Sequence, residues 1–327
     1  MDSLARTLPA SWFCSSPLYQ LERKGVFQKS WHFLGPVTRF QNRSEKIIYE
    51  IAQTTLIVEN RSPPREGIDT EGIIVYPEDP ALQIQSHLTP SGLVFATLSL
   101  NAPSFETYFE GLEQLINQVD FTKLPHRRSI SYEGRFNWKT MIDGFQECLH
   151  CQYTHPTFTK YYPPTFYSVT NHTNFSQHLA DPSKTSISDG LFLYFFPICT
   201  LNVYGGGISS FRTLPNTKPG VSRMEFDYYH EGTEEEFEAY FKFVRQVALE
   251  DFELCEKAQV NLESGVYGEG ILNPNKENGV AFYQGRVKEL VYKQYEEDQA
   301  AKELEGKIAD LRVGSGGEDV KVVVAVW

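Results

Sequence analysis

The sequence predicts an α+β protein in which an antiparallel sheet carries long helices on one face. Two regions rich in strand-forming residues predict the sheet. Alternating or branched apolar runs between proline, glycine and asparagine occupy much of 46–100, and similar runs recur at 191–231. Apolar residues at helical spacing predict a long helix at 233–265 and another from about 277 to 312.

The N-terminal third is predicted to hold one docking helix, several strands and a second helix. Residues 16–31 have helical spacing and end in an aromatic cluster, which predicts a helix that docks by that end. Residues 105–119 predict an amphipathic helix. The β-like runs between them are 46–61, 72–77, 81–88 and 92–100, with a break at 62–67.

The larger C-terminal part is predicted to begin with a strand at 128–138 and a helix at 139–151. The proline-rich aromatic segment 157–168 predicts a loop or lid. Three or four antiparallel strands are expected within 191–231.

The boundaries of the long helix are also readable. Thr233 and Glu236 predict a capping box at its start, and Gly265 predicts its end. The last residues, from 314 onwards, are expected to form a flexible tail or a late strand.

The amino-acid composition excludes some classes of function. The 327 residues are 41% hydrophobic, enough for one large domain or two modest ones. A net charge of −12 without a lysine- or arginine-rich run argues against nucleic acid. No segment is apolar enough to span a membrane, no signal peptide is evident, and five cysteines do not make a disulfide framework. We therefore expect a cytoplasmic protein with a small-molecule substrate, and its oligomeric state stays open.

One segment concentrates chemically active side chains. Residues 145–158 read FQECLHCQYTHPTF and include Glu147, His150 and His155. Ligands five residues apart require the helix to end near His155, and Pro156 gives a reason, because the residue before proline avoids helical ψ. Two neutral imidazoles and one carboxylate form the facial triad of non-haem iron(II) sites. Two structural histidines beside an acid remain the alternative.

The third ligand would come from the long helix. That helix offers Glu250, Asp251, Glu253 and Glu256. Asp251 lies between Leu249 and Phe252, on a face expected to meet the core, where a carboxylate needs a partner.

The same segment contains a CxxC pair, Cys148 and Cys151. The sequence has no second CxxC and no thioredoxin-like context. We interpret both as ordinary buried thiols.

Three segments resemble one known family in the right order. Residues 137–156, 250–291 and 8–37 are similar to Rieske-type ring-hydroxylating oxygenase large subunits, especially the choline and carnitine monooxygenase-like branch. The resemblance implies that His150, His155 and Asp251 bind one mononuclear Fe(2+). It also implies that Glu147 stands where the family places an acid linking its two redox centres, which makes Glu147 a candidate catalytic residue.

The resemblance implies a helix-grip (START-like) catalytic domain, with an antiparallel sheet around a long C-terminal helix. Residues 1–33 and 101–327 would form it, and 34–100 would be a reduced remnant of the family's N-terminal β lobe. The family encloses a deep apolar cavity under its long helix. Candidate pocket residues here are Phe145, Tyr153, Phe158, Tyr161, Phe192, Tyr194 and Tyr204.

Two departures from the family pattern affect function. A Rieske [2Fe-2S] cluster needs two cysteines and two histidines, yet between Ile47 and Gly92 the sequence has no cysteine and only His87. We therefore expect no cluster, as if the region that carries it were deleted. Gly144 stands where the family usually has asparagine near the iron.

Three functions remain open. The first is an iron enzyme, an oxidoreductase by lineage, that acts on a lipophilic molecule of specialised metabolism and takes electrons from its substrate or a small reductant. The second is a non-redox cyclase, pericyclase or isomerase that reuses the pocket to hold a reactive conformer. The third is a non-catalytic partner of an intact oxygenase.

Overall fold

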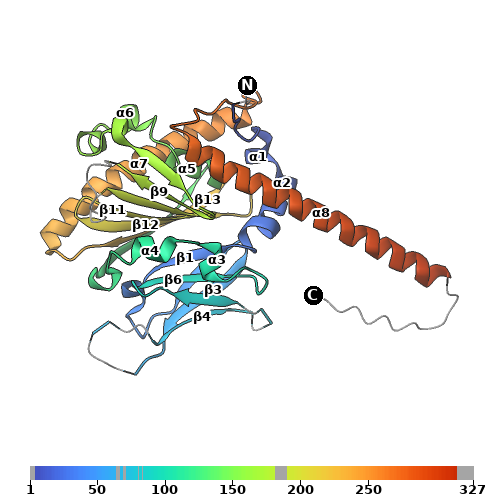
Figure 1. Cartoon of the computed structure of the whole chain (residues 1–327), viewed down its shortest axis with the longest axis horizontal. Helices are drawn as coiled ribbons and strands as arrows, with labels where there is room; N and C mark the ends of the chain where they lie inside the picture. Colours follow the sequence, from blue (N-terminus) through green and yellow to red (C-terminus); the bar gives the residue numbers. More distant parts are fainter. Residues whose placement is uncertain are drawn as a thin grey trace.

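A computed structural model describes residues 4–63, 67–68, 71–79, 81–82, 84–180 and 190–314 of the chain (Figure 1). The predicted tail lies outside these residues apart from its first position. Within the described residues, no helix is both long and apolar enough to cross a membrane.

A seven-stranded antiparallel sheet forms the centre of the molecule, in the order β7-β13-β12-β11-β10-β9-β8. Its neighbours in sequence pair as hairpins, except that β7 joins the edge beside β13. The strands are β7 (His126–Gly134), β8 (Ser168–Asn171), β9 (Phe175–Leu179), β10 (Leu191–Phe195), β11 (Cys199–Tyr204), β12 (Gly207–Pro215) and β13 (Ser222–Tyr229).

Two smaller antiparallel sheets lie beside it, in the orders β1-β6-β5 and β2-β3-β4 (Figure 1). Their strands are β1 (Trp31–Pro36), β2 (Ile47–Ile51), β3 (Thr54–Asn60), β4 (Ile73–Pro77), β5 (Gln85–Leu88) and β6 (Leu93–Thr97). The expected α+β class, with antiparallel sheets and long helices, is confirmed.

The helices are mostly short apart from the last two. The α-helices are α1 (Ser11–Cys14), α2 (Ser16–Glu22), α3 (Phe105–Tyr108), α4 (Leu112–Ile116), α5 (Trp138–Phe145), α6 (Cys151–Thr154), α7 (Glu234–Glu263) and α8 (Asn278–Gly314). A π-helical turn, η1 (Arg23–Phe27), continues α2, and 3-10 turns occur at η2 (Val37–Phe40), η3 (Phe121–Lys123), η4 (Phe158–Lys160) and η5 (Pro164–Phe166).

The helix that crosses the main sheet is α7 (Figure 1). It begins at the predicted capping box of Thr233 and Glu236, and Gly265 follows its end with φ 73°. Its own residues Phe237, Tyr240 and Val244 are buried. The C-terminal helix α8 instead passes α2 and η1 and then extends away from the body (Figure 1).

The core is continuous between the small sheets and the main sheet. The ring centroids of Phe33 in β1 and Phe195 in β10 lie 5.1 Å apart. The buried Arg212 of β12 donates to the Leu34 carbonyl at 2.9 Å and to Asp227 of β13 at 2.7 Å. This polar contact ties β1 to the sheet that carries the site.

Two turns account for differences from the predicted elements. The run 46–61 is a hairpin whose two-residue turn uses Ala52 and Gln53 at positive φ, without the usual Asn-Gly signal. The predicted helix 105–119 is broken at Gly111, which has φ 84° and separates α3 from α4.

The predicted helix 139–151 also divides in two. It stops at Phe145, because Gln146 turns its side chain to His178 and the Gly279 carbonyl. Strands β8 and β9, at 168–179, were not predicted; they form an edge of the main sheet.

Candidate metal centre

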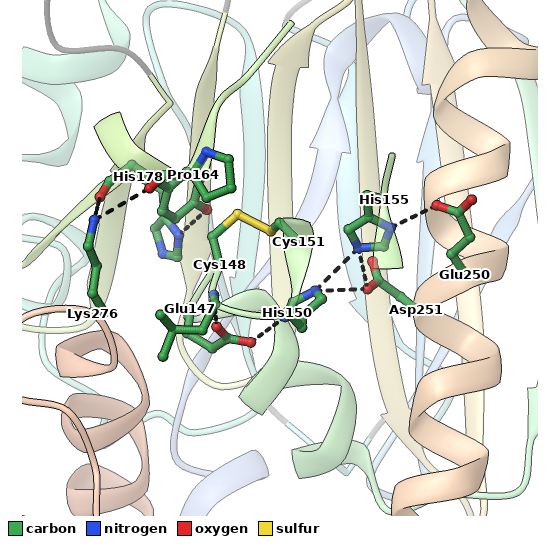
Figure 2. Close-up of a disulfide and its surroundings, with 12 residues drawn as sticks. Glu147, Cys148, His150, Cys151, His155, Pro164, His178, Glu250, Asp251 and Lys276 are labelled. Atoms are coloured by element: carbon green, nitrogen blue, oxygen red, sulfur yellow. Dashed lines mark hydrogen bonds and ion pairs between the residues drawn. A yellow bond between two sulfur atoms is a disulfide. The ribbon is translucent and has the colours of Figure 1, made fainter. Parts of the chain in front are cut away.

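Three side chains from two parts of the chain converge at one point (Figure 2). His150 precedes the first residue of α6 and His155 follows its last, so the short helix sets their spacing. Asp251 comes from α7. Its Oδ1 lies 3.3 Å from His150 Nε2 and 3.0 Å from His155 Nε2, and the two Nε2 atoms are 3.2 Å apart.

A second carboxylate holds each histidine from behind (Figure 2). His150 Nδ1 donates to Glu147, which also accepts from the Leu149 amide. His155 Nδ1 donates to Glu250 Oε2 at 2.8 Å. Because each Nδ1 proton is engaged by a carboxylate, each ring, when it is neutral, presents the lone pair of Nε2 toward Asp251.

Three electron-pair donors therefore meet in a partly buried space. His155 is 3% exposed and His150 16%. Such an arrangement requires a positive charge between the donors, either a metal ion or a proton. Burial lowers the pKa of His150, but Asp251 and Glu147 outweigh it and raise that pKa to about 10. Burial raises the pKa of Asp251, and the two imidazoles outweigh it and lower that pKa to about 2.

The donor set fits a divalent metal with open coordination positions, as in two-histidine, one-carboxylate iron(II) sites. Glu147 and Glu250 would then be the outer carboxylates that orient the imidazoles. Sequence reasoning considered Glu250 as a ligand and did not anticipate its bond to His155. The only signal for it is its position one residue before Asp251, which places the two carboxylates on opposite sides of the ring.

A cavity of about 90 Å³ lies beside the three donors, between α7 and the main sheet. Four residues predicted to form the pocket line it: Phe145, Phe158, Phe192 and Tyr204. Further lining residues that sequence reasoning missed are Met141, Tyr167, Asn202, Ser209, Phe211, Phe226, Tyr228, Val244, Val247 and Ala248. The lining residues on β12, Ser209 and Phe211, and those on β13, Phe226 and Tyr228, are each two residues apart, as expected for side chains on one face of a sheet.

Three predicted pocket residues do not line this cavity. Tyr153 and Tyr161 are 82% and 63% exposed, because they lie on the outer side of α6 and of the following turn. Tyr194 shares a strand face with Phe192, but α8 covers the sheet there. Its ring packs 6.2 Å from Tyr283, and its hydroxyl donates to the Pro197 carbonyl. Aromatic character alone therefore does not distinguish residues that line the cavity from residues that pack in the core.

A second cavity, of about 410 Å³, reaches two of the three donors, His150 and Asp251. The two cavities share Met141, Gly144, Glu147, His150 and Asp251. At Gly144, an added Cβ would meet only His150 Cε1, at 3.9 Å. The glycine leaves this junction open where a longer side chain would fill it.

A neutral histidine orders one wall of the first cavity. Gln146 donates through Nε2 to the Gly279 carbonyl, so its Oε1 accepts from His178 Nε2 at 2.6 Å. His178 Nδ1 therefore accepts from the Tyr167 hydroxyl at 2.8 Å. Burial lowers the pKa of His178 to about 3, which keeps the ring neutral. Tyr167 thus presents lone pairs rather than a proton toward the cavity.

The interpretation of Cys148 and Cys151 as ordinary thiols is wrong. They form a disulfide, with Cα atoms 5.0 Å apart, beside His150 (Figure 2). The turn between α5 and α6 brings the two residues within bonding range. Cys14, Cys199 and Cys255 are free.

The fold and these donors define a class of protein: a catalytic domain of mixed helix and antiparallel sheet with a His-His-Asp cluster beside an aromatic cavity. The chain belongs to the family of ring hydroxylating alpha subunits, in their catalytic domain, whose family model matches residues 121–183 and 167–293. It is therefore of oxidoreductase lineage.

Known proteins of this lineage resemble most of the chain. The carnitine monooxygenase oxygenase subunit of Escherichia coli (strain K12) is 22% identical over 355 residues, covering 88% of this chain and 94% of that protein. The subunit from Acinetobacter baumannii is 23% identical, covering 87% and 94%.

Solved structures show the same fold. A quaternary ammonium Rieske monooxygenase in complex with L-carnitine aligns with a TM-score of 0.71 at 19% identity, covering 88% of this chain and 96% of that one. Naphthalene 1,2-dioxygenase with indole bound in the active site aligns with a TM-score of 0.62 at 12% identity, covering 90% and 94%.

Proposed function

We propose that this protein is a mononuclear non-haem iron(II) enzyme that acts on a lipophilic small molecule, in specialised metabolism, without a Rieske cluster. The observation that carries the proposal is the convergence of His150 Nε2, His155 Nε2 and Asp251 Oδ1, with a carboxylate behind each imidazole. A merely structural pair of histidines has no need of that orientation.

His150, His155 and Asp251 would hold the iron, which supplies dioxygen activation when bound. The other residues bind and orient. Glu147 and Glu250 keep the Nδ1 protons in place, and Tyr167 accepts a hydrogen bond from a polar substituent of the substrate. The aromatic wall of the first cavity excludes water from the reacting carbon.

The absence of a cluster rests on the sequence. Cys14 is the only cysteine before Cys148, so the two cysteine ligands of a cluster have no candidates in the small sheets. The alignment with the E. coli relative runs over 355 residues but includes only 88% of these 327, so this chain is shorter than that relative within the aligned region. We assign 1–33 and 101–327 to a helix-grip catalytic domain and 34–100 to a remnant lobe.

The charges of the side chains that line the two cavities indicate the class of substrate. Among the described residues, neither cavity is lined by lysine or arginine, so a carboxylate such as that of carnitine has no cationic partner there. Most side chains around the first cavity are aromatic or aliphatic. A neutral, lipophilic molecule fits this wall better than a zwitterion.

A second candidate is a non-redox cyclase, pericyclase or isomerase. The observation that favours it is an apolar cavity next to a site whose electron relay has no ligands in the sequence. A shaped pocket that selects a near-attack conformer accelerates a unimolecular reaction without electrons.

Anaerobic titration with iron(II) tests the proposal. We expect one equivalent bound by the wild type and none by His150→Ala or His155→Ala, with unchanged circular dichroism. His126→Ala, on β7, is the matched control and should bind one equivalent. If the wild type binds no iron, the iron-enzyme proposal is wrong and the non-redox catalyst becomes the better candidate. Visible absorption typical of a Rieske centre after reconstitution would contradict the loss of the cluster.

A further inference from the structure

The disulfide between Cys148 and Cys151 lies in the wall of the first cavity. Both residues line that cavity, together with His150, His155 and Asp251. They are 6% and 5% exposed, so their sulfur atoms are shielded from bulk solvent. His150 lies between them in the sequence, and Figure 2 shows the sulfur–sulfur bond beside the imidazole pair.

The proposed iron chemistry has an unmet requirement at this place. Hydroxylation by dioxygen consumes two electrons beyond those of the C–H bond. The relatives named as Rieske monooxygenases have a cluster to deliver electrons, and this chain has no cysteines to hold one in the small sheets. A dithiol that closes to a disulfide releases two electrons and two protons in one step.

We propose that Cys148 and Cys151 are a redox-active dithiol that supplies the two electrons of turnover, an inference that rests on the proposed iron function. The overall step is R–H + O2 + two Cys–SH → R–OH + H2O + Cys–S–S–Cys. The C–H bond, the two S–H bonds and the O–O bond break, and the C–O bond, the S–S bond and three O–H bonds form, one in the alcohol and two in water. Dioxygen is reduced, while the substrate carbon and the two sulfurs are oxidised.

The disulfide is returned to the dithiol by thiol–disulfide exchange. The reductant is a thiol or dithiol small enough to enter the cavity, because 5–6% exposure denies both sulfurs to a large protein surface. Each cycle oxidises two external thiol groups to a disulfide and restores both cysteine thiols.

Two of the three free cysteines, Cys199 and Cys255, serve as internal controls. Cys199 is buried, and burial raises its pKa to about 12. Cys255 lies one turn after Asp251 on α7 and lines the second cavity, yet it is a free thiol. Cys255 is therefore near the same donors but has no sulfur partner with which to close.

The experiment follows disulfide closure. The full-length protein is reduced under nitrogen and loaded with one equivalent of iron(II), zinc(II) or no metal, and metal content is verified. It is then mixed with aerated buffer, quenched in acid, denatured and alkylated. Peptide mass then reports the fraction of Cys148 and Cys151 that has lost two hydrogens. Without substrate, the balance is two thiols and O2 giving a disulfide and H2O2.

We expect closure on the order of 10-fold faster with iron than with zinc or no metal, one O2 consumed per disulfide, and Cys255 still alkylated. Cys148→Ser should bind iron and lose the iron-dependent oxygen uptake. Equal closure rates in all three metal states, with iron bound, would assign the disulfide a purely structural role and overturn this inference alone. Failure of the wild type to bind iron would overturn the proposed function with it.

Discussion

His155 is held between two consecutive carboxylates of one helix. Glu250 accepts from its Nδ1, and Asp251 faces its Nε2. Successive residues on an α-helix point about 100° apart, so neighbours can reach opposite sides of one ring. Glu250 accepts in turn from Gln246, one turn earlier, at 2.9 Å. The orientation of the imidazole thus depends on a chain of side chains on α7.

We predict that Glu250→Gln weakens iron(II) binding by roughly 10- to 100-fold, because outer carboxylates fix the tautomer and raise the basicity of a metal-bound histidine. Anaerobic titration calorimetry measures the affinity. Glu253→Gln is the matched control, since Glu253 is 70% exposed and pairs only with Lys257 among the described ion pairs. Equal iron(II) affinity in the two variants would show that Glu250 does not contribute to metal binding.

Asp143 is a partly buried carboxyl whose protonation should affect stability. Burial raises its pKa to about 7, although Tyr283 and Gln284 donate to it. An unfolded aspartate has a pKa of about 3.9, so between these values the folded state keeps a proton that the unfolded chain releases. The free energy of unfolding that this proton contributes is greatest below the unfolded-state pKa, and it is lost as the pH rises toward 7.

We therefore predict that Asp143→Asn, which mimics the protonated carboxyl, gains stability relative to the wild type as pH rises from 5 to 8. The difference in unfolding free energy between the two proteins should change by roughly 2–3 kcal/mol over this pH range. Urea unfolding at several pH values measures it. A difference that stays constant with pH would show that Asp143 is ionised in the folded protein.

At the scale of elements, a fully buried ion pair joins α2 to α5. Lys139 Nζ lies 2.6 Å from Glu22 Oε1, and both side chains are 0% exposed. Trp138 Nε1 donates to the other oxygen of Glu22 at 2.8 Å. Since α5 leads into the segment with both histidines, this pair fixes the N-terminal helix against the base of the site.

We predict that Lys139→Met destabilises the protein by about 3–5 kcal/mol, because it leaves Glu22 buried and uncompensated. The double variant Glu22→Gln with Lys139→Met should be less destabilised than Lys139→Met alone, since Gln keeps an acceptor for Trp138. Chemical denaturation of the two single variants and the double variant gives the coupling. Additive losses would show that the pair does not act as a unit.

The helix boundaries near the site differ in how far the sequence predicts them. The start of α7 was predictable because a local signal, the Thr233–Glu236 box, determines it. The end of α5 was not, because Gln146 bonds to His178 and Gly279, which are far along the chain. Tertiary partners overrode helical propensity there.

At the scale of the whole molecule, the sequence predicted the meeting of His150, His155 and Asp251 through a family pattern, and the structure brings them together. It could not predict which aromatic side chains line the cavity. Tyr194 and Phe192 are equivalent by strand alternation, and only the path of α8 over the sheet separates them. Such differences depend on packing between elements distant in sequence.

Turnover by the intact protein distinguishes redox from non-redox chemistry. A ligand is first selected from lipophilic small molecules by its thermal stabilisation of the protein. Turnover is then measured in air and under nitrogen, each with and without a chelator, and product mass is compared with substrate mass. We expect product only in air and without chelator, heavier than the substrate by one oxygen atom, because all three metal donors and both outer carboxylates are in place.

The alternatives leave different signatures in the same experiment. A metal that acts only as a Lewis acid would give turnover that chelator stops and nitrogen does not. A pocket that only folds its substrate would give an isomer of unchanged mass under nitrogen with chelator present. That last result would refute the iron enzyme. It would mean that the fold had kept its cavity, while the His-His-Asp cluster had become a structural feature of α6 and α7.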